Sequence, residues 1–93
     1  MSDLPQFRDN GDLQRYEWAE DGLTTFAEYR RSGDRVLIPH VEAPPPLRGK
    51  GAADRLMRAI SAHARQQRLM IIPLCGYAHA WFRRHSENAD ILE

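Results

Sequence analysis

Three consecutive prolines, Pro44 to Pro46, divide the chain into two parts with different residue patterns. Each proline ring fixes φ and disfavours helix in the residue before it, so the block predicts a stiff, extended connector with any helix beginning after it. The part before the prolines is rich in aromatic and β-favouring residues, broken by turn-forming groups. It predicts an antiparallel meander of four strands at residues 7–10, 14–19, 23–30 and 36–41.

The part after the prolines predicts two helices around one strand. Apolar residues recur at helical spacing over residues 51–67, which is typical of an amphipathic helix that packs one face on a sheet. Residues 69–75 form an apolar run, the pattern of a strand covered on both faces, and a second helix is expected at about 77–85. The expected fold class is α/β, with a mixed, mostly antiparallel sheet, a β-α-β crossover and two helices. Pro39, which cannot donate a ladder hydrogen bond, predicts an edge position, a bulge or a local splay in the fourth strand.

Length and charge limit the classes of function. With 93 residues the chain is expected to form one domain, 1–93, because separate cores arise at two or three times this length. Thirteen Lys and Arg balance thirteen Asp and Glu, and this zero net charge counts against nucleic acid as a partner. The longest apolar run, interrupted by Pro73, is far shorter than the ~20 residues of a spanning helix, so no membrane association is expected. A single cysteine, with no charged-then-apolar leader at the start, favours the cytoplasm.

The segment Arg48-Gly49-Lys50-Gly51-Ala52-Ala53 lies between a predicted strand and a predicted helix. Its glycines let the backbone approach a ligand, and the small residues that follow keep side chains off the first helical turn. Free N–H groups and the positive end of the helix dipole then point at one place, where a phosphate fits. The alternative is a polar loop with glycine at the helix start, and spacing alone does not decide between the two. The segment is neither a Walker A loop nor the Rossmann glycine pattern.

The same segment resembles motif A of the GNAT acyltransferase superfamily, Arg/Gln-x-x-Gly-x-Gly/Ala, which Arg48, Gly51 and Ala53 satisfy. The layout also includes His-Val-Glu at 40–42, the prolines, a strand ending in Pro-Leu-Cys, then Gly-Tyr and Arg-Arg-His. From about Tyr16 to Asp90 it is similar to the minimal, single-domain branch sometimes called YjdJ-like.

This resemblance implies a minimal GNAT fold with a site for acetyl-coenzyme A (acetyl-CoA). The amides of residues 49–53 would surround the pyrophosphate, and the pantetheine arm would lie between strands that splay near Val41 and Cys75. The implied cofactor-binding residues are Val41, Arg48, Gly49, Lys50, Gly51, Ala52, Ala53 and Cys75.

Acetyl transfer to an amine needs a base for the amine and an acid for the departing thiolate. His40 and Glu42 alternate onto one face of a strand, so either is a candidate base; the alternative is a hydrogen-bonded or solvated strand residue. Cys75 is a candidate covalent intermediate, although a free cysteine is more often an inert packing residue. Tyr77 is a candidate proton donor to the thiolate, or else a packing residue with a hydrated hydroxyl.

We therefore expect an N-acetyltransferase that moves an acetyl group directly from acetyl-CoA to an amine, on a small molecule or a protein. A CoA- or acyl-CoA-binding module with little turnover is the alternative. The acceptor cleft is expected to be open, and a homodimer is one way to wall it. The aromatic and basic residues 81–85 are expected to be core plus solvated surface. His63 and His79 lack partners at metal-ligand spacing, so no metal site is expected.

Overall fold

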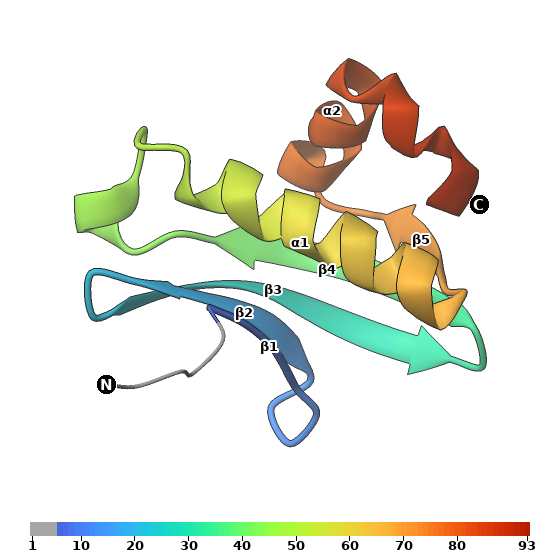
Figure 1. The fold of residues 1–93 in the computed structure, drawn as a ribbon, viewed down its shortest axis with the longest axis horizontal. Coiled ribbons are helices and arrows are strands. Elements are labelled where there is room, and N and C mark those ends of the chain that lie inside the picture. Colours follow the sequence, from blue (N-terminus) through green and yellow to red (C-terminus); the bar gives the residue numbers. More distant parts are fainter. Residues whose placement is uncertain (1–5) are drawn as a thin grey trace.

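An antiparallel meander forms the first four strands of the molecule, and a helix connects it to a fifth strand (Figure 1). The structure, a computed structural model, describes residues 6–93, so the first five residues of the expected domain 1–93 lie outside the described part. In chain order the elements are β1 (Phe7–Asn10), β2 (Arg15–Glu20), β3 (Leu23–Ser32), β4 (Arg35–Glu42), the 3₁₀ turn η1 (Pro45–Leu47), α1 (Ala52–Gln67), β5 (Met70–Pro73), α2 (Gly76–Arg84) and the 3₁₀ turn η2 (Ser86–Ile91).

The sheet has the strand order β1-β2-β3-β4-β5, with every pair antiparallel except β4 and β5, which are parallel. Local turn chemistry explains the meander. Asp21 and Gly22 join β2 to β3 as a two-residue turn with φ of 53° and 71°. Positive φ at both positions matches the right-handed twist of the flanking strands, and Asp-Gly tolerates it. The predicted α/β class, the meander and the β-α-β crossover are therefore confirmed.

Both helices cover the same face of the sheet, as Figure 1 shows for α1 above β4 and for α2 next to it. The core lies between the sheet and this helical layer. Its fully buried members include Leu56, Met57 and Ile60 of α1, Trp81 of α2, and Ile38 of β4. The opposite face of the sheet has no helix on it among residues 6–93, which an antiparallel meander tolerates when its strands alternate apolar and polar residues.

The prediction that residues 69–75 form a strand covered on both faces is wrong. The strand β5 ends at Pro73, and only Ile71 within it is buried. Leu74, which the prediction placed inside the strand, is 57% exposed. Because both helices lie on one face, the other face of β5 has no cover, and an apolar run by itself does not indicate how many faces are packed.

The sheet opens between β4 and β5, near Pro39. Between the pairs Glu28–His40 and Arg30–Leu37 the register shifts, so that β4 carries one more residue than β3. This is the bulge that Pro39 predicts, although β4 is a central strand and not an edge. Pairing of β4 with β5 ends at Ile38, whose carbonyl accepts from both Leu74 N and Cys75 N (3.0 and 3.2 Å). The last residues of β4 therefore pair with β3 alone, and the predicted splay is present.

The buried hydroxyl of Tyr29 is expected to make the protein less stable at high pH. Burial, with a hydrogen bond from Tyr29 Oη to Asp9 Oδ1 (2.6 Å), raises the pKa of Tyr29 to about 12. The unfolded chain releases this proton near the ordinary value of 10 and the folded chain holds it, so the free energy of unfolding falls as pH rises from 10 to 12. We expect Tyr29→Phe to make this fall shallower, measured as urea midpoints between pH 8 and 12. An unchanged slope would contradict the assignment.

Candidate functional site

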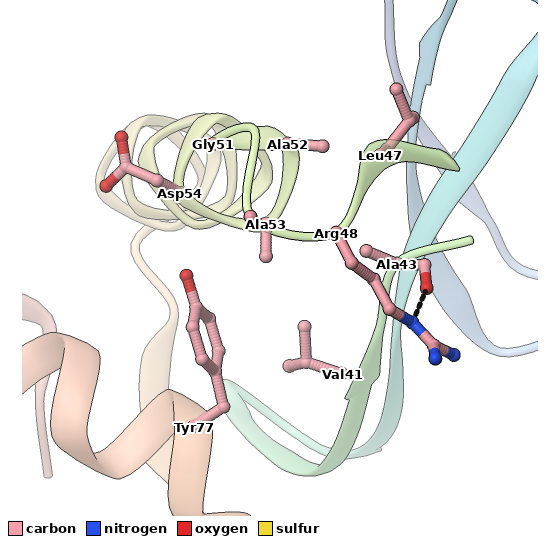
Figure 2. A pocket seen from close by; sticks show the side chains of 10 residues that line it. Val41, Ala43, Leu47, Arg48, Gly51, Ala52, Ala53, Asp54 and Tyr77 are labelled. Carbon is pink, nitrogen blue, oxygen red and sulfur yellow. Dashed lines mark hydrogen bonds between the residues drawn. The ribbon is translucent and has the colours of Figure 1, made fainter. Parts of the chain in front are cut away.

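A pocket of about 340 Å³ lies where the splayed end of β4 faces the start of α1. It is mostly apolar, and the loop between β4 and α1 forms one wall, as Figure 2 shows. The lining residues are Val41, Ala43, Leu47, Arg48, Gly49, Gly51, Ala52, Ala53, Asp54 and Tyr77. Six of the eight predicted cofactor-binding residues are among them; Lys50 and Cys75 are not. Ala43, Leu47 and Asp54 were not predicted, although the first two flank the prolines and Asp54 follows the motif directly.

The loop that lines the pocket has main-chain N–H groups without an internal partner. Gly49 and Gly51 have φ of 76° and 86°, a conformation that favours glycine and turns the chain sharply into the helix. Lys50 N is used within the loop, since it donates to Leu47 O (3.1 Å). Within residues 6–93 the N–H groups of residues 49, 51, 52 and 53 donate no main-chain hydrogen bond. These donors, with the positive end of the α1 dipole, form a site suited to an anion.

Charged side chains around the loop have different roles. Arg48 is exposed at the rim, and its Nε donates to Ala43 O (3.0 Å), so the guanidinium is held beside the residue that follows β4 (Figure 2). Asp54 adds a negative charge in the first turn of α1, a position that the helix dipole favours. Its burial opposes ionisation, but hydrogen bonds from Trp81 Nε1 (2.8 Å) and Arg58 Nε (2.9 Å) outweigh this and lower the pKa of Asp54. Arg58 thereby balances the charge of the Asp54 carboxylate next to the free N–H groups.

Tyr77, in the first turn of α2, faces the loop from the other side of the pocket. Figure 2 shows its hydroxyl directed towards the start of α1, with Val41 and Ala53 next to the ring. Its side chain is partly accessible, with the residue 37% exposed. Burial, and then the negative charge of Asp54, raise the pKa of Tyr77 above its ordinary value. The hydroxyl therefore keeps its proton at neutral pH and can donate it into the pocket.

Cys75 is the N-cap of α2 and does not line the pocket. Its Sγ accepts a hydrogen bond from Ala78 N (3.4 Å), and the half-buried side chain packs against the core. The sulfur therefore accepts a hydrogen bond from one of the N–H groups in the first turn of α2, which have no partner within the helix. The structure thus assigns Cys75 a capping and packing contact, next to the splay but outside the pocket wall.

His40 and Glu42 lie on the face of the sheet away from the helices. His40 pairs with Glu28, whereas its neighbour Val41 pairs with the buried Ala27, so the two side chains of β4 point to opposite faces. His40 Nε2 and Glu42 Oε1 are 3.0 Å apart, and the two side chains are 47% and 49% exposed. They share a face, as predicted, but that face is not the one that holds the pocket. They border the same unpaired end of β4 from its other side.

Residues 81–85 are divided between the core and the surface, as predicted. Trp81 and Phe82 are buried in the core, and Arg83 and Arg84 are exposed. His85 stacks on Trp81, with ring centroids 4.1 Å apart. In the part of the chain that the structure describes, no three His, Cys, Asp or Glu residues come together as a metal site would require. None of its helices has both the length and the apolar character to cross a membrane.

Comparison with known proteins agrees with this architecture. A family model described as GCN5-related N-acetyltransferase matches residues 15–91. Among solved structures, the chain is similar to a Staphylococcus aureus protein described as GCN5-like, which was determined by NMR in solution. The TM-score is 0.73 and the identity 24%, over 100% of this chain and 91% of that one. At this identity the structural likeness shows the fold alone. No curated protein matched the sequence.

Proposed function

The chain belongs to the GCN5-related N-acetyltransferase family, and on this premise we propose that it transfers an acetyl group from acetyl-CoA directly to an amine. The observation that carries the proposal is the set of free main-chain donors at residues 49 and 51–53, which face a pocket beside the splayed end of β4. Free N–H groups at a helix start bind a diphosphate, and β4 beyond Ile38 no longer pairs with β5, so one edge of it is available to the rest of the ligand.

The residues present fit coenzyme A. The four free amides and the α1 dipole suit the pyrophosphate, and Arg48 adds a cation at the rim. A side chain at Gly49 would meet nothing within 4 Å, so the approach to the loop is open. Val41 and Ala43 give the pocket an apolar wall along β4 for the pantetheine arm. Lys50 and Cys75, which lie outside the pocket lining, remain predicted contacts at its margin.

The proposed acid and base lie on opposite faces of the sheet beside the splayed end of β4. Tyr77 is the acid, and the His40–Glu42 pair supplies the base. Tyr77 holds its proton at neutral pH and faces the pocket, so we assign it the transfer of a proton to the departing thiolate. Histidine is the side chain most often used as a general base, and Glu42, whose Oε1 lies 3.0 Å from His40 Nε2, orients the His40 ring. His40 is therefore the proposed base. The capping contact of Cys75 supports direct transfer without an acetyl-cysteine.

A coenzyme-A-binding module with little turnover is the second candidate. The observation that favours it is the exposure of His40 and Glu42, about half for each side chain, on the face of the sheet that no helix covers within residues 6–93. An acceptor amine next to a solvent-exposed base has few contacts that would hold it in position for the reaction. The open face admits either a small amine or the lysine of a protein as acceptor.

Release of free thiol separates these two functions. The protein is incubated with acetyl-CoA and a panel of amines, and thiol is followed with a colorimetric reagent. We expect release that depends on the amine, about a hundredfold slower in His40→Ala because the amine then loses its proton to water, and unchanged in Cys75→Ala. Binding of CoA without any amine-dependent release would favour the binding module. Loss of activity in Cys75→Ala would contradict direct transfer.

A further inference from the structure

An arginine that does not line the pocket holds the loop that does. Arg55, one turn into α1, donates through Nη2 to Lys50 O (3.0 Å). The same guanidinium makes a two-bond contact with Glu20, from Nε to Oε1 and from Nη2 to Oε2, both at 2.9 Å. Glu20 ends β2, 35 residues away in the sequence, and it also accepts from Trp18 Nε1 (2.8 Å). The loop is thereby tied to the rigid β2–β3 hairpin.

The contact with Lys50 O determines where one of the free amides points. Lys50 C=O and Gly51 N–H belong to the same trans peptide group, in which the carbonyl and the N–H point in opposite directions. Holding Lys50 O against Arg55 therefore directs the Gly51 N–H away from Arg55. That N–H has no acceptor within residues 6–93, and Gly51 lines the pocket. A Cβ on Gly51 would lie 2.8 Å from Arg55 Nη1, so the guanidinium and the loop are in close contact.

We propose that Arg55, held in place by Glu20, is a positioning residue that fixes the 50–51 peptide group so that the Gly51 amide is ready to bind the diphosphate of coenzyme A. The proposal rests on the proposed function, because it assigns the loop that ligand. The hydrogen bonds from Arg55 also lower the pKa of Glu20, so the carboxylate stays charged and the contact persists at neutral pH. Without the contact between Arg55 and Lys50 O, the 50–51 peptide group is free to rotate in the unbound protein. Binding then has to fix its orientation, which lowers the affinity.

Direct contact of Arg55 with the phosphate makes the opposite prediction for Glu20. If Arg55 were itself a phosphate ligand, Glu20 would compete for its guanidinium, and removal of the Glu20 charge would strengthen binding. If Arg55 positions the loop, removal of the Glu20 charge loosens Arg55 and weakens binding. The sign of the Glu20→Gln effect therefore separates the two roles.

Calorimetric titration with CoA tests the proposal on the full chain. We expect Kd to rise about tenfold in Arg55→Met and several-fold in Glu20→Gln, with the double variant no weaker than Arg55→Met alone, since one tie is lost in each case. Arg55→Lys is not expected to restore affinity, because one ammonium does not reproduce the planar fork. In the free protein, the Gly51 amide resonance should shift in Arg55→Met before any ligand is added.

Arg65→Met is the matched control, because Arg65 lies on the same helix and makes an equivalent two-bond contact with Asp90 (2.8 and 2.9 Å) away from the pocket. The Kd of Arg65→Met for CoA should equal that of the wild type. Wild-type affinity in Arg55→Met, tighter binding in Glu20→Gln, or equal losses in Arg55→Met and Arg65→Met would overturn the proposal. Failure of the wild-type protein to bind CoA would instead overturn the proposed function on which it rests.

Discussion

Replacing Gly51 by glutamate is expected to weaken CoA binding at least a hundredfold while the protein stays folded. Gly51 is the N-cap of α1 and has a φ of 86°, so its N–H is one of the free donors at the pocket. A carboxylate at this position faces the diphosphate, and a like-charge contact costs several kcal/mol, where each 1.4 kcal/mol is about tenfold in affinity. The added Cβ would also displace Arg55, since it would lie 2.8 Å from Nη1.

The fold should survive this substitution with a measurable loss. A side chain in the left-handed region costs about 1–2 kcal/mol, while a negative charge near the helix start returns part of this through the dipole. Gly33→Glu is the matched control: Gly33 has a φ of 61°, lies in the β3–β4 turn and has open space around it. It carries the same strain and the same charge away from the pocket. Calorimetry measures the affinity of both variants for CoA, and thermal unfolding measures their stability. Near-wild-type affinity in a folded Gly51→Glu would show that the diphosphate does not lie at this loop.

The features that the sequence predicts correctly are those in which neighbouring residues determine the structure. Asp21-Gly22 specifies its hairpin because the turn needs two residues that tolerate positive φ. The free amides at residues 49 and 51–53 follow from a glycine-rich segment that leads directly into a helix, a local arrangement in which each N–H is placed by the adjacent backbone. Most of the pocket was therefore predictable, because one contiguous segment builds it.

The features that were missed depend on residues far apart in the chain. The bulge at Pro39 was predicted, but its consequence was not: both helices lie on one face of the sheet, so Val41 lines the pocket while His40 and Glu42 lie on the other face. Likewise, nothing in the local pattern around Arg55 indicates that its partner is Glu20. Long-range packing selects such contacts, and the local sequence permits many others.

Tyr77→Phe is expected to lower kcat about a hundredfold or more, with little change in the affinity for CoA. A positioned acid contributes ~10²- to 10⁴-fold in rate, and Tyr77 has the only phenolic hydroxyl among the pocket-lining residues of the described chain. The phenylalanine ring keeps the apolar wall, so the ground-state contacts with the pantetheine arm persist. Steady-state kinetics of thiol release measures kcat, and calorimetry measures the affinity separately.

The pH profile gives this prediction a second readout. Burial raises the pKa of Tyr77, so the acid form of the hydroxyl persists above the ordinary value of 10, and kcat of the wild type should hold to that pH before it declines. In Tyr77→Phe this alkaline decline should be absent. Tyr29→Phe is the control, because Tyr29 is buried in the core and hydrogen-bonded to Asp9, so its loss should change stability at high pH and leave kcat at neutral pH as it was. An unchanged kcat in Tyr77→Phe would show that the thiolate takes its proton from water, and that the tyrosine serves only as a wall of the pocket.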